Sequence, residues 1–91
     1  MEIKLDDHNI YLEVKELVRK LAKRRERLRI TQAEIAQYMG TSESAISRLE
    51  NYSGVKGSLE LPRIDTLDNY ASALGLMLEI EIVKKNENHL V

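Results

Sequence analysis

Lysine and arginine side chains gather in one stretch of the chain, residues 15–29, which holds eight of them against Glu16 and Glu26. The eight are Lys15, Arg19, Lys20, Lys23, Arg24, Arg25, Arg27 and Arg29. Cations at this density bind phosphate when they share one face of a protein. The net charge of −1 does not exclude this, because the acidic residues lie mostly elsewhere. The same pattern also suits an ordinary solvated helix face, so both interpretations stay open.

The residue types that support catalysis or metal binding are scarce. The chain has no cysteine, and its two histidines, His8 and His89, lie near opposite ends. No nucleophilic side chain is paired with a general base, and the sequence contains no phosphate-binding loop. The apolar runs are far shorter than a membrane span, and the N-terminus lacks the apolar core of a signal peptide. We therefore expect one cytoplasmic domain of 91 residues that is not an enzyme and needs no cofactor, metal or membrane.

Helical periodicity covers most of the chain. Asp6 and Asp7 are candidate N-caps for a helix from about His8 to Arg29, within a unit of residues 1–30. Another helix is expected over about Ile64 to Leu74, within residues 63–75, after a surface loop at residues 53–62. The residues expected to face the core are Ile10, Val14, Leu17, Val18 and Leu21 in the first helix and Ile64, Leu67, Tyr70, Ala71 and Leu74 in the last.

Residues 31–52 have the spacing of a helix-turn-helix. Thr31 begins a capping box, T-x-x-E, and Gly40 ends that helix because glycine accepts a left-handed conformation. Ser42 then caps the next helix, and Ala36 is small enough to let the two helices approach closely. The apolar residues expected between them are Ile35, Met39, Ile46 and Leu49. In such a motif the second helix enters the major groove of DNA.

These features resemble the Xre-type helix-turn-helix family of lambdoid phage repressors and related antitoxins, including HigA-like antitoxins. The matching motifs are T-Q-A-E-I-A, G-T-S, I-S-R-L-E-N and P-R-I-x-T-L-x-x-Y-A-S-A-L-G, and the resemblance covers about residues 17–76. It implies a mainly α, four- to five-helix, lambda-repressor-like domain that binds double-stranded DNA. The chain departs from the family in a longer loop after Asn51 and in a strand where many members have a fifth helix.

The resemblance also implies roles for single residues. Those that would face base edges are Glu43, Ser44 and Arg48, and those that would contact the DNA backbone are Gln32, Ser42, Ser47, Asn51, Lys56 and Arg63. Arg25 would pair with Glu50, either partly buried or as an exposed surface pair. Arginine bidentate to guanine is the commonest specific contact, so Arg48 is our leading base reader, with a phosphate contact as the alternative. Glu43 would either accept from a cytosine amino group or only favour its helix N-terminus.

The hydrophobic period changes from 3.6 to 2 in residues 76–83, before a tail at residues 84–91. The residues that share one face there are Leu76, Leu78, Ile80 and Ile82. This alternation predicts a half-buried strand, and a lone strand cannot satisfy its backbone groups. Its expected partner is the same segment of a second copy, although residues 1–5 also look extended. Such a homodimer would place two recognition helices about 34 Å apart on a palindromic operator.

We therefore predict a dimeric, sequence-specific regulator that represses its own promoter. We favour the antitoxin of a toxin–antitoxin pair, with a toxin protein as partner, over a free-standing or phage-type repressor. The competing class is a protein-interaction module that keeps this fold and does not bind DNA. The near-neutral charge and Glu43 support that class, whereas Gln32, Arg48 and Asn51 oppose it.

Overall fold

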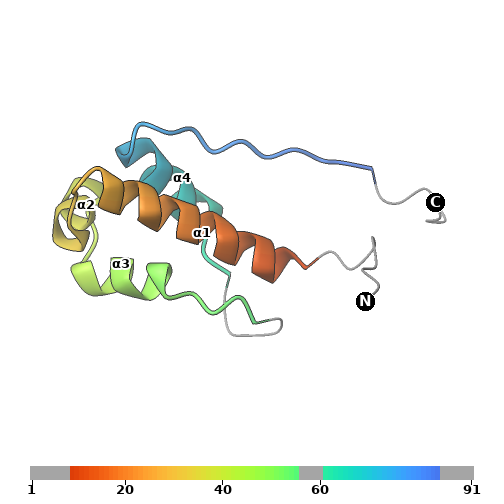
Figure 1. The fold of residues 1–91 in the computed structure, drawn as a ribbon, viewed down its shortest axis with the longest axis horizontal. Helices are drawn as coiled ribbons and strands as arrows, with labels where there is room; N and C mark the ends of the chain where they lie inside the picture. The colour runs from red at the N-terminus through yellow and green to blue at the C-terminus, as the bar shows by residue number, and fades with distance from the viewer. Residues whose placement is uncertain (1–8, 56–60, 85–91) are drawn as a thin grey trace.

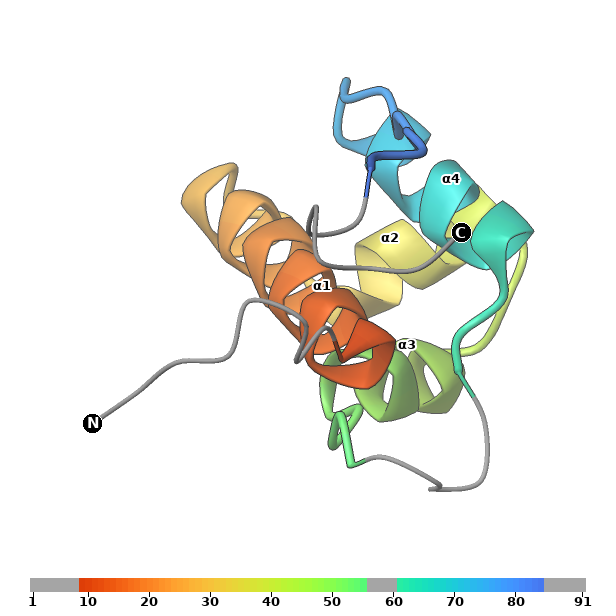
Figure 2. The same ribbon diagram turned by 90° about the vertical axis from the view of Figure 1, so that its right-hand side faces the viewer.

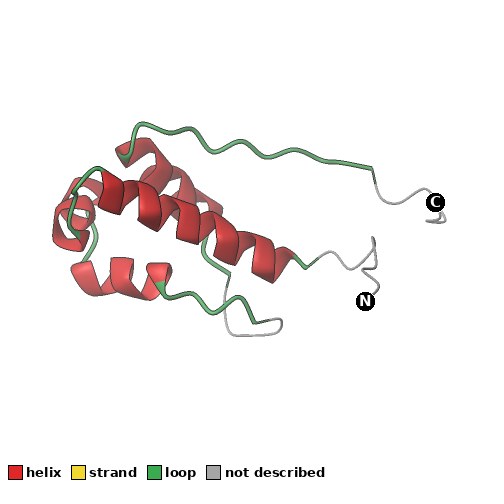
Figure 3. Ribbon diagram, in the orientation of Figure 1, coloured by secondary structure: helices red, strands yellow, loops and turns green. Residues whose placement is uncertain are grey.

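The computed structural model describes residues 9–55 and 61–84, which form four α-helices (Figure 1). Their bounds are α1 Ile10–Arg27, α2 Gln32–Met39, α3 Glu43–Glu50 and α4 Ile64–Ala73. Both α1 and α2 pack on α3 and on α4 (Figures 1 and 2). The rest of the described chain is loop and turn (Figure 3). The fold is therefore mainly helical.

The two short helices begin and end where the local signals predicted. Thr31 Oγ1 accepts from the backbone N–H of Glu34 at 3.0 Å, and the Glu34 carboxylate accepts from the N–H of Thr31 at 2.8 Å. Ser42 Oγ accepts from the N–H of Ala45 at 3.1 Å. Gly40 follows α2 with a φ of 71°, a left-handed conformation in which a side chain would be strained. Gly40 and Ser42 together fix the short turn between α2 and α3.

The start of α1 differs from the prediction. Its N-cap is Asn9, whose side-chain oxygen accepts from the backbone N–H of Tyr11 at 3.0 Å. A cap at Asp6 or Asp7 is therefore wrong, and these two residues and His8 lie outside the described residues. Asn9 is as good an N-cap as aspartate, so residue type alone does not distinguish it from Asp6 and Asp7.

The end of α1 also comes two residues earlier than predicted, at Arg27 rather than Arg29. Arg29 has a φ of 60°, so it cannot continue a right-handed helix. The backbone closes in a Schellman turn, in which the N–H of Ile30 donates to the carbonyl of Arg25 at 3.1 Å. The carbonyl groups at the helix end are satisfied by this turn, although the residue at the left-handed position is not glycine.

One hydrophobic core joins all four helices. Its buried members are Val18, Leu21, Ile35, Ala36, Ile46, Leu67, Tyr70, Ala71 and Leu74. Two residues expected in this core are exposed instead, Ile10 at 46% and Ile64 at 61%. Each lies in the first turn of its helix, at the edge of the bundle, where the neighbouring helices no longer cover it.

The chain leaving α3 passes directly against α1. Gly54 is buried there, with a φ of 72°. A Cβ atom at this position would lie 2.8 Å from the Cδ of Lys15 and 3.2 Å from the carbonyl oxygen of Tyr11. Only glycine permits both this conformation and this approach.

Residues 76–84 extend away from α4 (Figure 1). Leu78 packs partly against the core, but Ile80 is 66% and Ile82 99% exposed. No strand forms within residues 9–55 and 61–84. A strand needs a neighbouring strand for its backbone hydrogen bonds, so the predicted dimer strand stays a prediction.

Candidate nucleic-acid interface

The outer face of α3 presents the residues expected to read bases. Glu43, Ser44 and Arg48 are exposed, and Ser47 is half-buried between them. In the described part of the chain, no residue forms a hydrogen bond or ion pair with the guanidinium of Arg48. Its guanidinium is therefore free to present two parallel donors to an acceptor pair, which is the geometry that guanine offers in the major groove.

The two ends of α3 hold further polar groups on this face. At the N-terminal end, Ser42 Oγ lies 3.4 Å from Ser44 Oγ. At the C-terminal end, the amide nitrogen of Asn51 donates to the carbonyl of Ser47 at 2.8 Å and lies 3.4 Å from its hydroxyl. Asn51 thus closes the C-terminal end of the helix, and it would have to share or exchange this bond to donate to a phosphate.

A buried polar cluster, formed by Glu50, Arg25, Gln32 and Tyr70, fixes the C-terminal end of α3 and is called the Glu50 cluster below. Arg25 Nε donates to Glu50 at 2.7 Å and its Nη2 donates at 3.0 Å, so the pair is bidentate. Gln32 Nε2 donates to the same carboxylate at 2.9 Å, and the Tyr70 hydroxyl also donates to it. The side chains of Arg25 and Glu50 are each only 9% exposed. One carboxylate therefore links α1, α2, α3 and α4.

Electrostatics keep the Glu50 cluster charged. Burial raises the pKa of Glu50, but hydrogen bonds from Arg25, Tyr70 and Gln32 and the positive charge of Arg25 outweigh it, so the pKa lies below its ordinary value. The hydrogen bond to Glu50 raises the pKa of Arg25 against the opposing effect of burial. Burial and the hydrogen bond to Glu50 together raise the pKa of Tyr70. Glu50 and Arg25 are thus ionised and Tyr70 is a neutral donor at neutral pH.

The cluster changes the expectation for Gln32. This residue was expected to donate to a DNA phosphate, but one of its amide N–H groups already donates to Glu50. The other N–H remains for a phosphate, and Gln32 is the first residue of α2, where backbone N–H groups favour anions. Glu50 thus orients the side chain beside the place where a phosphate would bind. Sequence reasoning missed the role of Tyr70, which carries no local signal for a partner twenty residues away.

Arg63 is held by a neighbour instead of being free. Its Nε and Nη2 donate to the Asp65 carboxylate at 3.0 and 2.9 Å, in an exposed bidentate pair. Arg63 and Arg48 line one shallow groove of about 540 Å³, with Tyr52 and Pro62 among its other walls. The two arginines therefore lie on the same side of the molecule. Lys56, the other loop candidate, lies outside the described residues.

The basic stretch of α1 divides into two groups. Arg25 is buried in the Glu50 cluster and Arg24 and Lys15 are half-buried. The remaining five side chains are exposed, namely Arg19, Lys20, Lys23, Arg27 and Arg29. These five belong to α1 and the turn after it rather than to α3, so they are not part of the α3 face.

The described helices include none long and apolar enough to cross a membrane. In the same residues, no three His, Cys, Asp or Glu side chains form a group that could hold a metal ion.

A family model described as Helix-turn-helix domain matches residues 16–81. The chain belongs to this helix-turn-helix family. The matched span contains α2, α3, α4, the part of α1 from residue 16 onward and all four residues of the Glu50 cluster. No curated protein and no solved structure matches the chain.

Proposed function

We propose that this helix-turn-helix protein is a sequence-specific regulator that binds double-stranded DNA through the outer face of α3. The observation that carries the proposal is Arg48, an exposed and unpaired arginine on the second helix of the motif. Ser44 and Glu43 lie beside it on the same exposed face, with Arg48 as the residue best suited to discriminate a base. Glu43 would restrict the sequences bound, because a carboxylate accepts from cytosine and repels phosphate.

The backbone contacts come from groups at the edges of that face. Gln32 would donate to one phosphate, and Ser42, Ser47 and Asn51 border α3 at its two ends. Arg63 would reach a phosphate after exchanging Asp65 for it. Each phosphate that the protein neutralises releases counterions, so binding must weaken as salt increases.

The test is fluorescence anisotropy with a duplex from upstream of the protein's own gene, a scrambled duplex, and two salt concentrations. Arg48→Ala should lose the preference for the cognate duplex, with a cost of about 1–3 kcal/mol at one base position. Arg19→Ala, which removes an exposed arginine from α1, is the matched control and should keep the preference. Equal binding of wild type to both duplexes would reduce Arg48 to a phosphate contact. No binding to either would favour a protein-interaction module on this fold.

We also propose that residues 76–83 pair with their copy in a two-fold homodimer. The support is apolar side chains left in solvent by the single chain, including Met77, Ile80 and Ile82. Charge restricts the register. An antiparallel pair centred on Ile80 would set Glu79 opposite Glu81, so the repulsion between these carboxylates disfavours that register.

Light scattering after size exclusion tests the dimer. The full chain should be dimeric, and Ile80→Asp/Ile82→Asp should be monomeric with an unchanged helical spectrum, because both side chains are exposed in the single chain. A variant that stays dimeric would show that the copies associate elsewhere.

For the biological role, we propose autorepression by the antitoxin of a toxin–antitoxin pair, supported by the Xre-type motifs. A free-standing or phage-type repressor is the alternative. Co-expression with the product of the adjacent gene decides between them, since an antitoxin must copurify with that product and relieve its toxicity.

A further inference from the structure

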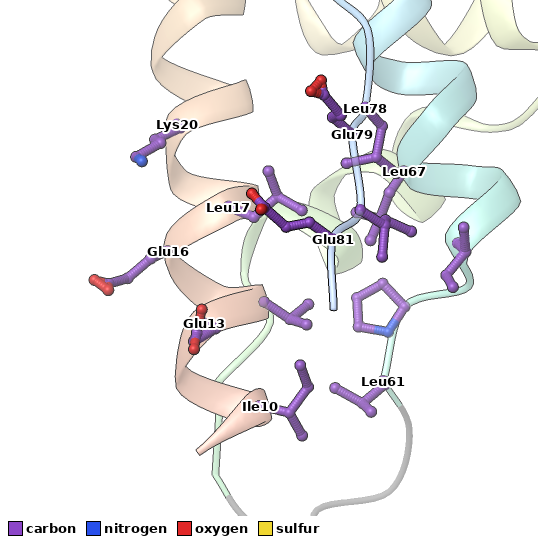
Figure 4. A pocket seen from close by; sticks show the side chains of 14 residues that line it. Ile10, Glu13, Glu16, Leu17, Lys20, Leu61, Leu67, Leu78, Glu79 and Glu81 are labelled. Carbon is purple, nitrogen blue, oxygen red and sulfur yellow. The ribbon is translucent and has the colours of Figure 1, made fainter. Parts of the chain in front are cut away.

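A groove with an apolar floor lies on the side of the molecule where the extended C-terminal segment passes between α1 and α4 (Figure 4). Its volume is about 550 Å³, within the range of roughly 300–1,000 Å³ found for ligand clefts. The floor residues include Ile10, Val14, Leu17, Leu67, Leu78 and Ile80. None of the residues named for DNA contact lines this groove, so it is a separate surface.

The rim of this groove is acidic. Glu13 borders it from α1, and Glu79 and Glu81 border it from the extended segment, whereas the carboxylate of Glu16, which also belongs to the lining, points away from the groove (Figure 4). The only cation among its lining residues in the described chain is Lys20. All four carboxylates and Lys20 belong to exposed residues. The acidic rim contrasts with the outer face of α1 further along, where exposed lysines and arginines dominate.

The charge of the rim decides which occupant fits. A second copy's extended segment lying in the groove, rather than alongside residues 76–83 as in the proposed strand pair, would bring its own Glu79 and Glu81 against these carboxylates, which repel it. A segment with apolar side chains and positive charges would instead bury its apolar atoms on the floor and place its charges on the rim. We propose that this acidic groove binds a partner protein through a short apolar segment flanked by lysine or arginine.

The proposal goes beyond DNA binding and does not depend on it, because the groove shares no residue with the α3 face. The exposed apolar atoms of Ile10 and Ile80 give the affinity, and the carboxylates select the charge of the partner. Because Ile80 also belongs to the segment proposed to pair in the dimer, a bound partner and a second copy would influence each other.

The probe is a fluorescein-labelled peptide, Lys-Lys-Leu-Val-Leu-Lys-Lys, measured by anisotropy against the full chain. Its control peptide has glutamate at every lysine position. Glu79→Gln/Glu81→Gln should weaken binding of the lysine peptide between about 2-fold and 30-fold, from two exposed ion pairs. The matched control Glu26→Gln/Asp68→Asn removes two exposed carboxylates away from the groove and should bind as wild type does.

A separate variant tests whether the apolar floor of the groove contributes to peptide binding. Ile10→Ser is expected to weaken the lysine peptide without unfolding the domain, because this side chain is nearly half exposed. Three results would each overturn the proposal: no binding of the lysine peptide to wild type, equal weakening in the two double variants, or equal binding of the glutamate peptide. DNA anisotropy on Glu79→Gln/Glu81→Gln, run in parallel, should match wild type, so failure of the groove and failure of DNA binding are told apart.

Discussion

Replacing Arg25 with methionine should be among the most damaging single changes in this protein. Methionine keeps much of the length of the arginine side chain and removes its charge and donors. Three hydrogen bonds would be lost, two to Glu50 and one from Nη1 to the carbonyl of Ile30 at 2.6 Å. Glu50, whose side chain is 9% exposed in the wild type, would keep only the neutral donors Gln32 and Tyr70. A buried carboxylate without its counter-charge is strongly destabilising.

The magnitude follows from measured buried pairs, in which removing one partner costs about 3–5 kcal/mol. A domain of 91 residues has an unfolding free energy of roughly 5–14 kcal/mol. The variant should therefore lose a large share of its stability, and its Tm should fall by about 12–40 °C. The loss should also depend on pH. Because the folded-state pKa of Glu50 is lowered, its contribution is present above the ordinary glutamate pKa of about 4.3 and disappears as pH falls through the folded value.

The assay is urea and thermal denaturation followed by far-UV circular dichroism at pH 7 and at steps below pH 5. Arg63→Met is the matched control, because Arg63 forms the same bidentate pair with Asp65 while 79% exposed, and its loss should hardly change Tm. The difference between wild type and Arg25→Met should narrow in acid. If Arg25→Met costs no more than Arg63→Met at pH 7, the Glu50 cluster is not a buried charge network and this reasoning fails.

Three further substitutions test the Tyr70–Glu50 bond, the Arg63–Asp65 pair and the backbone at Gly54. Tyr70→Phe should lower the unfolding free energy by about 1.5–3 kcal/mol, because the hydrogen bond to Glu50 is lost. Because the pKa of Tyr70 is raised, the wild type should also lose stability as pH rises above about 10. Denaturation of the variant over the same pH range should not show this loss. Asp65→Asn should free Arg63, giving tighter DNA binding and a log–log salt slope steeper by about 0.9 in anisotropy titrations. Gly54→Ala should cost at least about 1 kcal/mol in urea denaturation, since it combines a positive φ with crowding against α1.

The sequence predicted the helix-turn-helix well because its signals are local. The capping box at Thr31, the left-handed Gly40 and the cap at Ser42 each act within a few residues. The ends of α1 were harder. Several N-cap residues are adjacent there, and Arg29 takes a left-handed conformation that a single sequence gives no reason to expect of arginine.

Contacts between distant residues were the part that sequence could not supply. The family resemblance implied the Arg25–Glu50 pair, but neither it nor the helical spacing placed Tyr70 and Gln32 on the same carboxylate. Arg63 looked free from its position before α4, although Asp65 two residues later holds it. The strand at residues 76–83 was predicted from alternation, which identifies a face but cannot provide the backbone partner that a strand requires.

The structure separates the residues that position α3 from the residue expected to read DNA, and this separation can be tested with one pair of variants. Arg48 is exposed and unpaired, so Arg48→Ala should lower DNA affinity and leave Tm unchanged. Arg25 contacts no exposed part of α3 but fixes its end through Glu50, so Arg25→Met should lower Tm and reduce DNA affinity only by disturbing the helix or depleting the folded protein. Measuring the DNA affinity at a temperature well below the thermal unfolding midpoint of each variant removes the effect of depleted folded protein. A remaining loss of affinity in Arg25→Met would then report how far the orientation of α3 depends on the Arg25–Glu50 pair, whereas wild-type affinity would show that this orientation does not depend on Arg25.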